Sequence, residues 1–393
     1  MASARPSADP RASLAPIEAA VNEELKRLLE QGPTEAELAR IGHELQPLDI
    51  VLVKSGAVYG TEASGVRRAT AAEFTNSDAF VLTNGSGANR YPLRAGTDAA
   101  DIGVAISALE AQRLLEQAFA VMARARAQIR QPVDSLAQVT ISLVDTRGVP
   151  LGIVRSPDAP LFGIDVSLQK ARSAALLSNP QAGAELLADP SPDVRAFVPA
   201  MRSFFADPAA LTGRVAFSDR AIGNLARPYF PDGELGRPQG PLSRPIAKWS
   251  AFSTGLQSAL VLTNLGQHLN FVTGASLTDT PARCSFLPDV APGQNRLQNG
   301  LQIFPGSVPI YRGNQLVGAI GVSGDGIDQD DMIAFLGLNN AGLSVGGIGN
   351  APAAIRADNL IFGVAGGSVR LRYVNCPFAP FLDTAQQDVC KGL

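Results

Sequence analysis

The sequence predicts an α+β fold in which an antiparallel sheet is flanked by helices and interrupted by a long loop-rich insertion. Three observations support this prediction. Two pairs of short apolar segments, within 138–155 and 308–322, are each joined by a glycine-containing turn, as in a β-hairpin. Segments with apolar residues at three- and four-residue spacing accompany both pairs, which predicts flanking helices. Loops rich in proline and glycine fill residues 179–302, between the two pairs.

The composition is that of a folded protein with a sizeable core. Of the 393 residues, 46% are hydrophobic and 18% are charged, which excludes global disorder. The formal net charge of −3 offers no excess of cations for a phosphate backbone, so nucleic acid is not an expected partner. No apolar stretch approaches the roughly 18 residues of a membrane span. With His43 and His268 as its two histidines, the chain cannot form a zinc site of three histidines.

Residues 1–100 form an N-terminal extension in this interpretation. Residues 16–30 have the apolar spacing of an amphipathic helix, and Thr34 with Glu37 forms a capping box for a second one. Apolar runs at 49–53 and 79–82 predict strands. The first ten residues contain no apolar run of the signal-peptide type.

Residues 101–178 supply the first half of the predicted core. Ser107 and Glu110 form a capping box at the start of a helix. A clean strand, a turn at Asp145–Gly148 and a return strand follow, and then a second helix. These elements are expected at about 108–128, 138–144, 149–155 and 165–177.

The insertion at 179–302 alternates helical fragments with Pro/Gly-rich loops. Residues 303–343 supply the second half of the core, and residues 344–393 form a C-terminal extension. An acidic helix begins at Asp328 and is expected to end near Leu336, with a flexible segment from Gly342 to Gly349. Strands are expected at 308–312, 315–322, 360–362 and 369–374.

The three cysteines are Cys284, Cys376 and Cys390. A disulfide between Cys376 and Cys390 would tether a Pro-rich tail that has little core of its own. Cys284 could equally be a partner, and three buried free thiols are the alternative. A disulfide would imply an oxidising compartment, and therefore a secreted or periplasmic protein.

Two blocks of this sequence resemble the GlcG/HbpS-like haem-binding family, also called haem-degrading. The second block contains Pro305-Gly306-Ser307-Val308-Pro309-Ile310, followed by Leu316 to Gly324 and by the acidic residues Asp328 to Asp331. The first block contains Val144 to Gly148 and Lys170 to Ala174. The resemblance covers about 108–178 and 303–343. It implies a bacterial protein with the fold predicted above, haem as cofactor, and assembly into a homo-oligomer.

A ligand site is expected beside the loops Pro305–Pro309 and Gly321–Gly326. Their glycines let the backbone approach a ligand closely, and the helix that follows could hold a carboxylate or propionate at its N-terminus. The alternative is that these glycines only pack a strand against a helix, with Asp328 as a cap. The candidate ligand-binding residues are Pro305, Gly306, Ser307, Pro309, Gly321, Ser323, Gly324, Asp325, Arg155 and Lys170.

Two of these candidates, Arg155 and Lys170, could pair with acid groups of a ligand, or form internal salt bridges instead. Haem iron is usually bound by His, Met, Cys or Tyr. His268 is therefore the candidate metal ligand, although it lies in the insertion and is equally compatible with an ordinary surface residue.

Three functions are compatible with these residues. The first is an exported module that binds haem or another bulky acidic or planar small molecule. The second is an enzyme on the same scaffold that acts on a small organic substrate or degrades haem, with catalytic residues unknown. The third is a structural or assembly subunit whose insertion and tail form interfaces.

Overall fold

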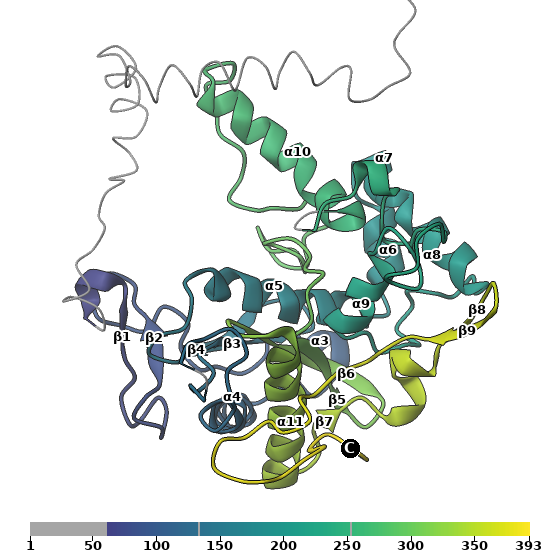
Figure 1. Ribbon diagram of the computed structural model, residues 1–393. Helices are drawn as coiled ribbons and strands as arrows, with labels where there is room; N and C mark the ends of the chain where they lie inside the picture. The colour runs from purple at the N-terminus through teal and green to yellow at the C-terminus, as the bar shows by residue number, and fades with distance from the viewer. Residues whose placement is uncertain (1–60, 133, 252–253) are drawn as a thin grey trace, which may run out of the picture. The chain divides into compact units, whose positions relative to one another are not determined.

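A computed structural model of the chain describes residues 61–132, 134–251 and 254–393 (Figure 1). The helices predicted at 16–30 and after Thr34, and the strand predicted at 49–53, lie outside the described residues. The described part contains a large antiparallel sheet with helices on both faces, which confirms the predicted fold class.

The sheet has seven strands, all paired antiparallel. Along the chain, these are β1 (Val66–Arg68), β2 (Phe80–Leu82), β3 (Thr140–Asp145), β4 (Pro150–Arg155), β5 (Ser307–Arg312), β6 (Gln315–Ser323) and β7 (Gly349–Asn350). Across the sheet, their order is β1-β2-β4-β3-β6-β5-β7. Strands β1 and β7 were not predicted, because both are too short to show an apolar alternation.

The two predicted hairpins join side by side at the centre of this sheet. Strand β3 pairs with β6 so that Thr140 lies opposite Ser323 and Asp145 lies opposite Gly318. The insertion therefore separates two halves of one sheet in the sequence, while the hydrogen bonds between β3 and β6 unite them in space.

Three helices cover the sheet, one on one face and two on the other (Figure 1). They are α4 (Ala108–Met122), α5 (Phe162–Leu177) and α11 (Ile327–Val345). Helix α5 crosses β6 closely, because a Cβ atom at Gly321 would lie 2.1 Å from Ser167 O. Helices α4 and α11 pack together on the opposite face, where a Cβ atom at Gly337 would lie 2.5 Å from Ala118 Cα. Glycine at these two positions therefore allows α5 to approach β6, and α11 to approach α4, this closely.

The predicted helix boundaries needed three corrections, of which the smallest is that α5 begins at Phe162 rather than at 165. The Ser107–Glu110 capping box of α4 is confirmed, but α4 ends at Met122 rather than at 128. The chain leaves the helix there because Ala125 and Arg126 form bridges with Phe381 and Leu136. Helix α11 continues to Val345, nine residues beyond the expected end, and includes part of the segment predicted to be flexible. Packing of α11 against α4 outweighs the low helix propensity of the glycines in α11.

The insertion adds five helices, and their apolar side chains join the same hydrophobic core as the sheet. Helix α10 differs from the others, since it begins among buried residues such as Leu256 and Leu260 while its second half is exposed. The five helices are α6 (Ala182–Leu187), α7 (Pro192–Arg195), α8 (Phe197–Phe205), α9 (Asp219–Leu225) and α10 (Gly255–Val272).

The C-terminal extension contains a separate hairpin of β8 (Ile361–Val364) and β9 (Gly367–Arg370). The second strand ends at Arg370 rather than at Val374, and Leu371 N donates to Leu360 O in register with the hairpin just beyond it. Short helical segments complete the described chain: η3 (Glu62–Ser64), α3 (Ala99–Ile102), η4 (Ile246–Lys248), η5 (Ala353–Ile355) and η6 (Ala357–Asn359).

The tail is closed by a disulfide between Cys376 and Cys390, one of the pairings the sequence left open. Cys284 is a free thiol. Within the described residues, no helix combines the length and the apolar character that crossing a membrane requires.

Candidate functional site

The loop before β5 covers a buried ion pair. Lys170 Nζ lies 2.9 Å from Asp330 Oδ2 and donates to Val322 O at 2.8 Å. A Cβ atom at Gly306 would lie 2.7 Å from Lys170 Nζ, so only glycine lets the loop pass over the pair at this distance. Burial raises the pKa of Asp330 to about 7, against the attraction of Lys170. Lys170 therefore has the internal salt bridge that the sequence offered as one of two possibilities.

A second group of buried charges adjoins this pair. Arg220, at the start of α9, makes ion pairs with Asp331 and, at 2.6 Å, with Asp328 Oδ1. Asp331 Oδ2 also accepts from Asn375 N at 2.9 Å, and burial raises its pKa to about 6. Asp219 is fully buried nearby, and desolvation raises its pKa well above the ordinary value. These groups form a buried charged cluster that joins α5, α9 and α11.

The loop at Ser323–Gly326 is occupied by contacts from the chain itself. Asp325 Oδ1 accepts from Gln128 N at 2.6 Å and from Gly326 N at 2.8 Å. A Cβ atom at Gly324 would lie 2.5 Å from Gln138 O. Asp325 thereby holds the segment after α4 against the N-terminus of α11.

The remaining predicted residues lie in the sheet or on α10. Gly321 is covered by α5, and Pro309 lies in β5 opposite Ala319. Arg155 is buried at the end of β4 and donates to Ala159 O. His268 is half exposed on α10, where its Nδ1 lies 2.8 Å from Asp279 Oδ1. The structure thus brings Lys170, Gly306 and Ser307 to the charged cluster and separates them from His268.

Pro305 lines a cleft of about 390 Å³, which we call the arginine cleft. This volume is within the roughly 300–1,000 Å³ of small-molecule sites. Apolar side chains also line it, including those of Phe230 and Leu371, and Asp232 is the one acidic residue in its described lining. Its walls come from α9 and the turn after it, the loop before β5, the start of α11, and β9 with the two residues that follow. Four arginines line this cleft: Arg220, Arg227, Arg370 and Arg372.

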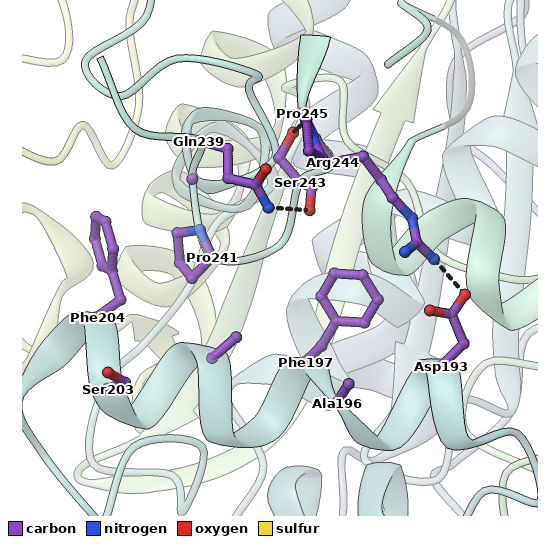
Figure 2. A pocket seen from close by; sticks show the side chains of 12 residues that line it. Asp193, Ala196, Phe197, Ser203, Phe204, Gln239, Pro241, Ser243, Arg244 and Pro245 are labelled. Carbon is purple, nitrogen blue, oxygen red and sulfur yellow. Dashed lines mark hydrogen bonds and ion pairs between the residues drawn. The ribbon is translucent and has the colours of Figure 1, made fainter. Parts of the chain in front are cut away.

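A second cavity of about 400 Å³ lies between α7, α8 and the loop at 239–245 (Figure 2). Its two charged lining residues, Arg244 and Asp193, form an ion pair with each other. The Arg244 guanidinium also lies 5.5 Å from the centre of the Phe197 ring. This cavity therefore offers no uncompensated charge to a ligand, whereas the arginine cleft does.

Sequence reasoning missed most residues of the arginine cleft. Arg370 and Arg372 alternate with the buried Leu371, a pattern that places two like charges on one side of an extended segment. That alternation was a usable signal. No sequence signal pointed to Arg227, because only tertiary packing brings the turn after α9 beside β9.

The cleft fits the acid groups of haem but does not supply an iron ligand. Guanidinium groups pair well with carboxylates such as propionates. Iron in haem is usually bound by His, Cys, Met or Tyr, and none of the described residues that line the arginine cleft is of these types. Within the described ranges, there is also no group of three or more His, Cys, Asp or Glu residues that could hold a metal ion.

The matches to solved structures include two weak likenesses. One is to the structure titled "Crystal Structure of PduOC:Heme Complex", with 17% identity, a TM-score of 0.27, and coverage of 63% of this chain and 100% of that one. The other is to the Klebsiella pneumoniae protein ORFY, with 18% identity, a TM-score of 0.27, and coverage of 66% and 97%. The search of curated proteins gives no significant match.

A family model described as haem degrading protein HbpS-like matches residues 248–339. This range contains β5 and β6, Pro305 and the first part of α11. It also reaches back into residues 248–302, which the sequence interpretation assigned to the insertion. The predicted resemblance is confirmed, and the chain is similar to the HbpS-like haem-degrading family over these residues.

Proposed function

We propose that this protein is a binding module of the HbpS-like type for haem or another bulky acidic, planar small molecule. One observation carries the proposal: Pro305 lies inside the matched range and lines a cleft with four arginines and one aspartate. The apolar residues of the cleft suit the body of such a ligand, and the guanidinium groups suit its carboxylates.

An absorbance titration of the full chain with haemin tests this proposal. We expect a saturable spectral change at micromolar protein, weakened by Arg372→Gln. Arg113→Gln is the matched control, because Arg113 lies on α4, outside the cleft, and pairs with Glu116. Absence of a saturable change with the unmodified chain would remove haem as the ligand.

We also propose that the protein is exported, and the Cys376–Cys390 disulfide supports this. Disulfides persist in oxidising compartments and are rare in the cytosol. Protein taken directly from its native cell fraction should show one reactive thiol, that of Cys284, until a reductant is added. Three reactive thiols without reductant would contradict export.

An assembly role is the second candidate, and helix α10 favours it. Its exposed half presents Leu262, Leu265, Leu269 and Val272, each between 56% and 63% exposed. Their spacing of three, four and three residues is that of a coiled-coil seam. Because α10 contains no Asp, Glu, Lys or Arg, an equally uncharged α10 from a second copy is the partner we propose.

Light scattering after size-exclusion chromatography tests the assembly role. Leu265→Asp with Leu269→Asp should convert an oligomer to a monomer, because each places a charge in the seam. Asn270→Asp puts the same charge on α10 beside the seam and should leave the oligomer intact. A monomeric unmodified chain would contradict this second candidate.

A further inference from the structure

We infer that the arginine cleft recognises its ligand through two carboxylate groups rather than through a metal, so that the ligand class is a bulky dicarboxylic acid with an apolar body. This inference rests on the proposed function for the location of the site. It goes beyond that proposal because it makes iron dispensable for binding.

Two cations of the cleft have no carboxylate partner within the part of the chain that the structure describes. Arg220 is neutralised by Asp328 and Asp331. Arg227 Nε lies 3.4 Å from Asp232 Oδ2, which compensates a second guanidinium. The two uncompensated guanidinium groups are therefore those of the other lining arginines, Arg370 and Arg372.

Arg370 and Arg372 can both turn toward a ligand. Arg370 Nη1 donates to Asp358 O at 2.7 Å, a contact with a neutral carbonyl that leaves the positive charge in place. Arg372 has no hydrogen-bond or ion-pair partner among the residues the structure describes. Both side chains are exposed while Leu371 between them is buried, so the two guanidinium groups lie on one side of the segment. In an extended chain their Cα atoms are about 7 Å apart, which suits two separate carboxylates.

The floor of the cleft supplies the apolar contact. Phe230, Ile303 and Leu371 are buried core residues that reach its wall. A ligand with a bulky apolar body and two acid groups at one edge would contact the apolar side chains with its body and the two guanidinium groups with its carboxylates. Among the residues the structure describes, none that usually binds haem iron lines the cleft, and this lining does not distinguish an iron porphyrin from an iron-free one.

Three ligands separate recognition of the acids from recognition of the metal: haemin, iron-free protoporphyrin IX, and the dimethyl ester of the latter. We expect fluorescence and absorbance titrations to give dissociation constants within about threefold for the two free acids. The dimethyl ester should bind at least about tenfold more weakly, because it loses both charge-assisted contacts.

Two variants locate the contacts. Arg370→Gln and Arg372→Gln should each weaken binding of the two free acids by about tenfold, since each removes one guanidinium. Neither variant should change the dissociation constant of the ester. Both residues are exposed, so the fold should tolerate the changes. Arg113→Gln, on α4, should change none of the dissociation constants.

The outcomes distinguish this inference from the proposed function. If haemin binds and iron-free protoporphyrin does not, the module binds haem through its metal and this inference is wrong. The inference is equally wrong if the ester binds as tightly as the free acid. If neither haemin nor the iron-free acid binds, the proposed function fails, and this inference fails with it.

Discussion

Lys170 Nζ and Asp330 Oδ2 lie 2.9 Å apart with both side chains buried, so that an ion pair connects α5 to α11 beside the C-terminal end of β6. The pair lies directly beneath Gly306, whose loop also contributes Pro305 to the arginine cleft. The position of that cleft therefore depends on a buried electrostatic contact. Breaking such a pair leaves one charge without compensation, which costs more than the pair contributes when intact.

We expect Lys170→Met to destabilise the protein by about 3 kcal/mol, because Asp330 then has to stay buried without its cation. Urea unfolding followed by circular dichroism measures the change. The double variant Lys170→Met/Asp330→Asn should recover part of the loss, because no buried charge is left unpaired. A loss below about 1 kcal/mol would contradict this prediction, since the pair would then be either solvated or neutral through protonation of Asp330.

The stability of the protein should fall as the pH rises from 5.5 to 7.5. Burial raises the pKa of Asp330 to about 7 and that of Asp331 to about 6, both above the value near 3.9 of an unfolded chain. In this range the folded state holds more protons than the unfolded state, so the free energy of unfolding decreases with increasing pH. We expect the free energy of unfolding, measured with urea, to decrease by about 3 kcal/mol across the range.

Asp330→Asn provides the control for this pH dependence. Without the Asp330 carboxyl, the decrease between pH 5.5 and 7.5 should fall to about a third, because only Asp331 of the two still titrates. An unchanged slope in the variant would assign the dependence to other groups.

Replacing Gly321 by alanine should be strongly destabilising. The added Cβ atom would lie 2.1 Å from Ser167 O and 2.5 Å from Ala171 N, and both are backbone atoms of α5 that cannot turn aside. We expect a loss of about 3 kcal/mol in thermal or urea unfolding. Gly363→Ala, in β8, is the control, because its Cβ atom meets nothing within 4 Å and the effect should stay within about 0.5 kcal/mol.

Reduction of the disulfide should destabilise the C-terminal tail. Cys376 and Cys390 are 14 residues apart, and closing a loop of this size stabilises a fold by about 3 kcal/mol in the chain-entropy model. The double variant Cys376→Ser/Cys390→Ser should therefore unfold at lower urea concentration and become insensitive to reductant. Cys284→Ser should keep the full response to reductant, because Cys284 is a free thiol.

The sequence alone determined the elements whose stability is mostly local. The hairpins at β3–β4 and β5–β6, the Ser107–Glu110 capping box and the α+β class were all readable, because alternation, turn glycines and capping residues act between near neighbours. The resemblance carried by Pro305 to Gly324 was readable as well. These signals placed the candidate site near the Pro305 loop.

Only the tertiary structure decided which charges meet. It paired Lys170 with Asp330, although 160 residues separate them, and so gave Lys170 a structural partner. It extended α11 to Val345, because packing against α4 compensates for glycine. It also brought Arg227 beside Arg370 and Arg372 in one cleft. Contacts between such distant segments depend on how whole elements pack, and local sequence patterns carry no information about that packing.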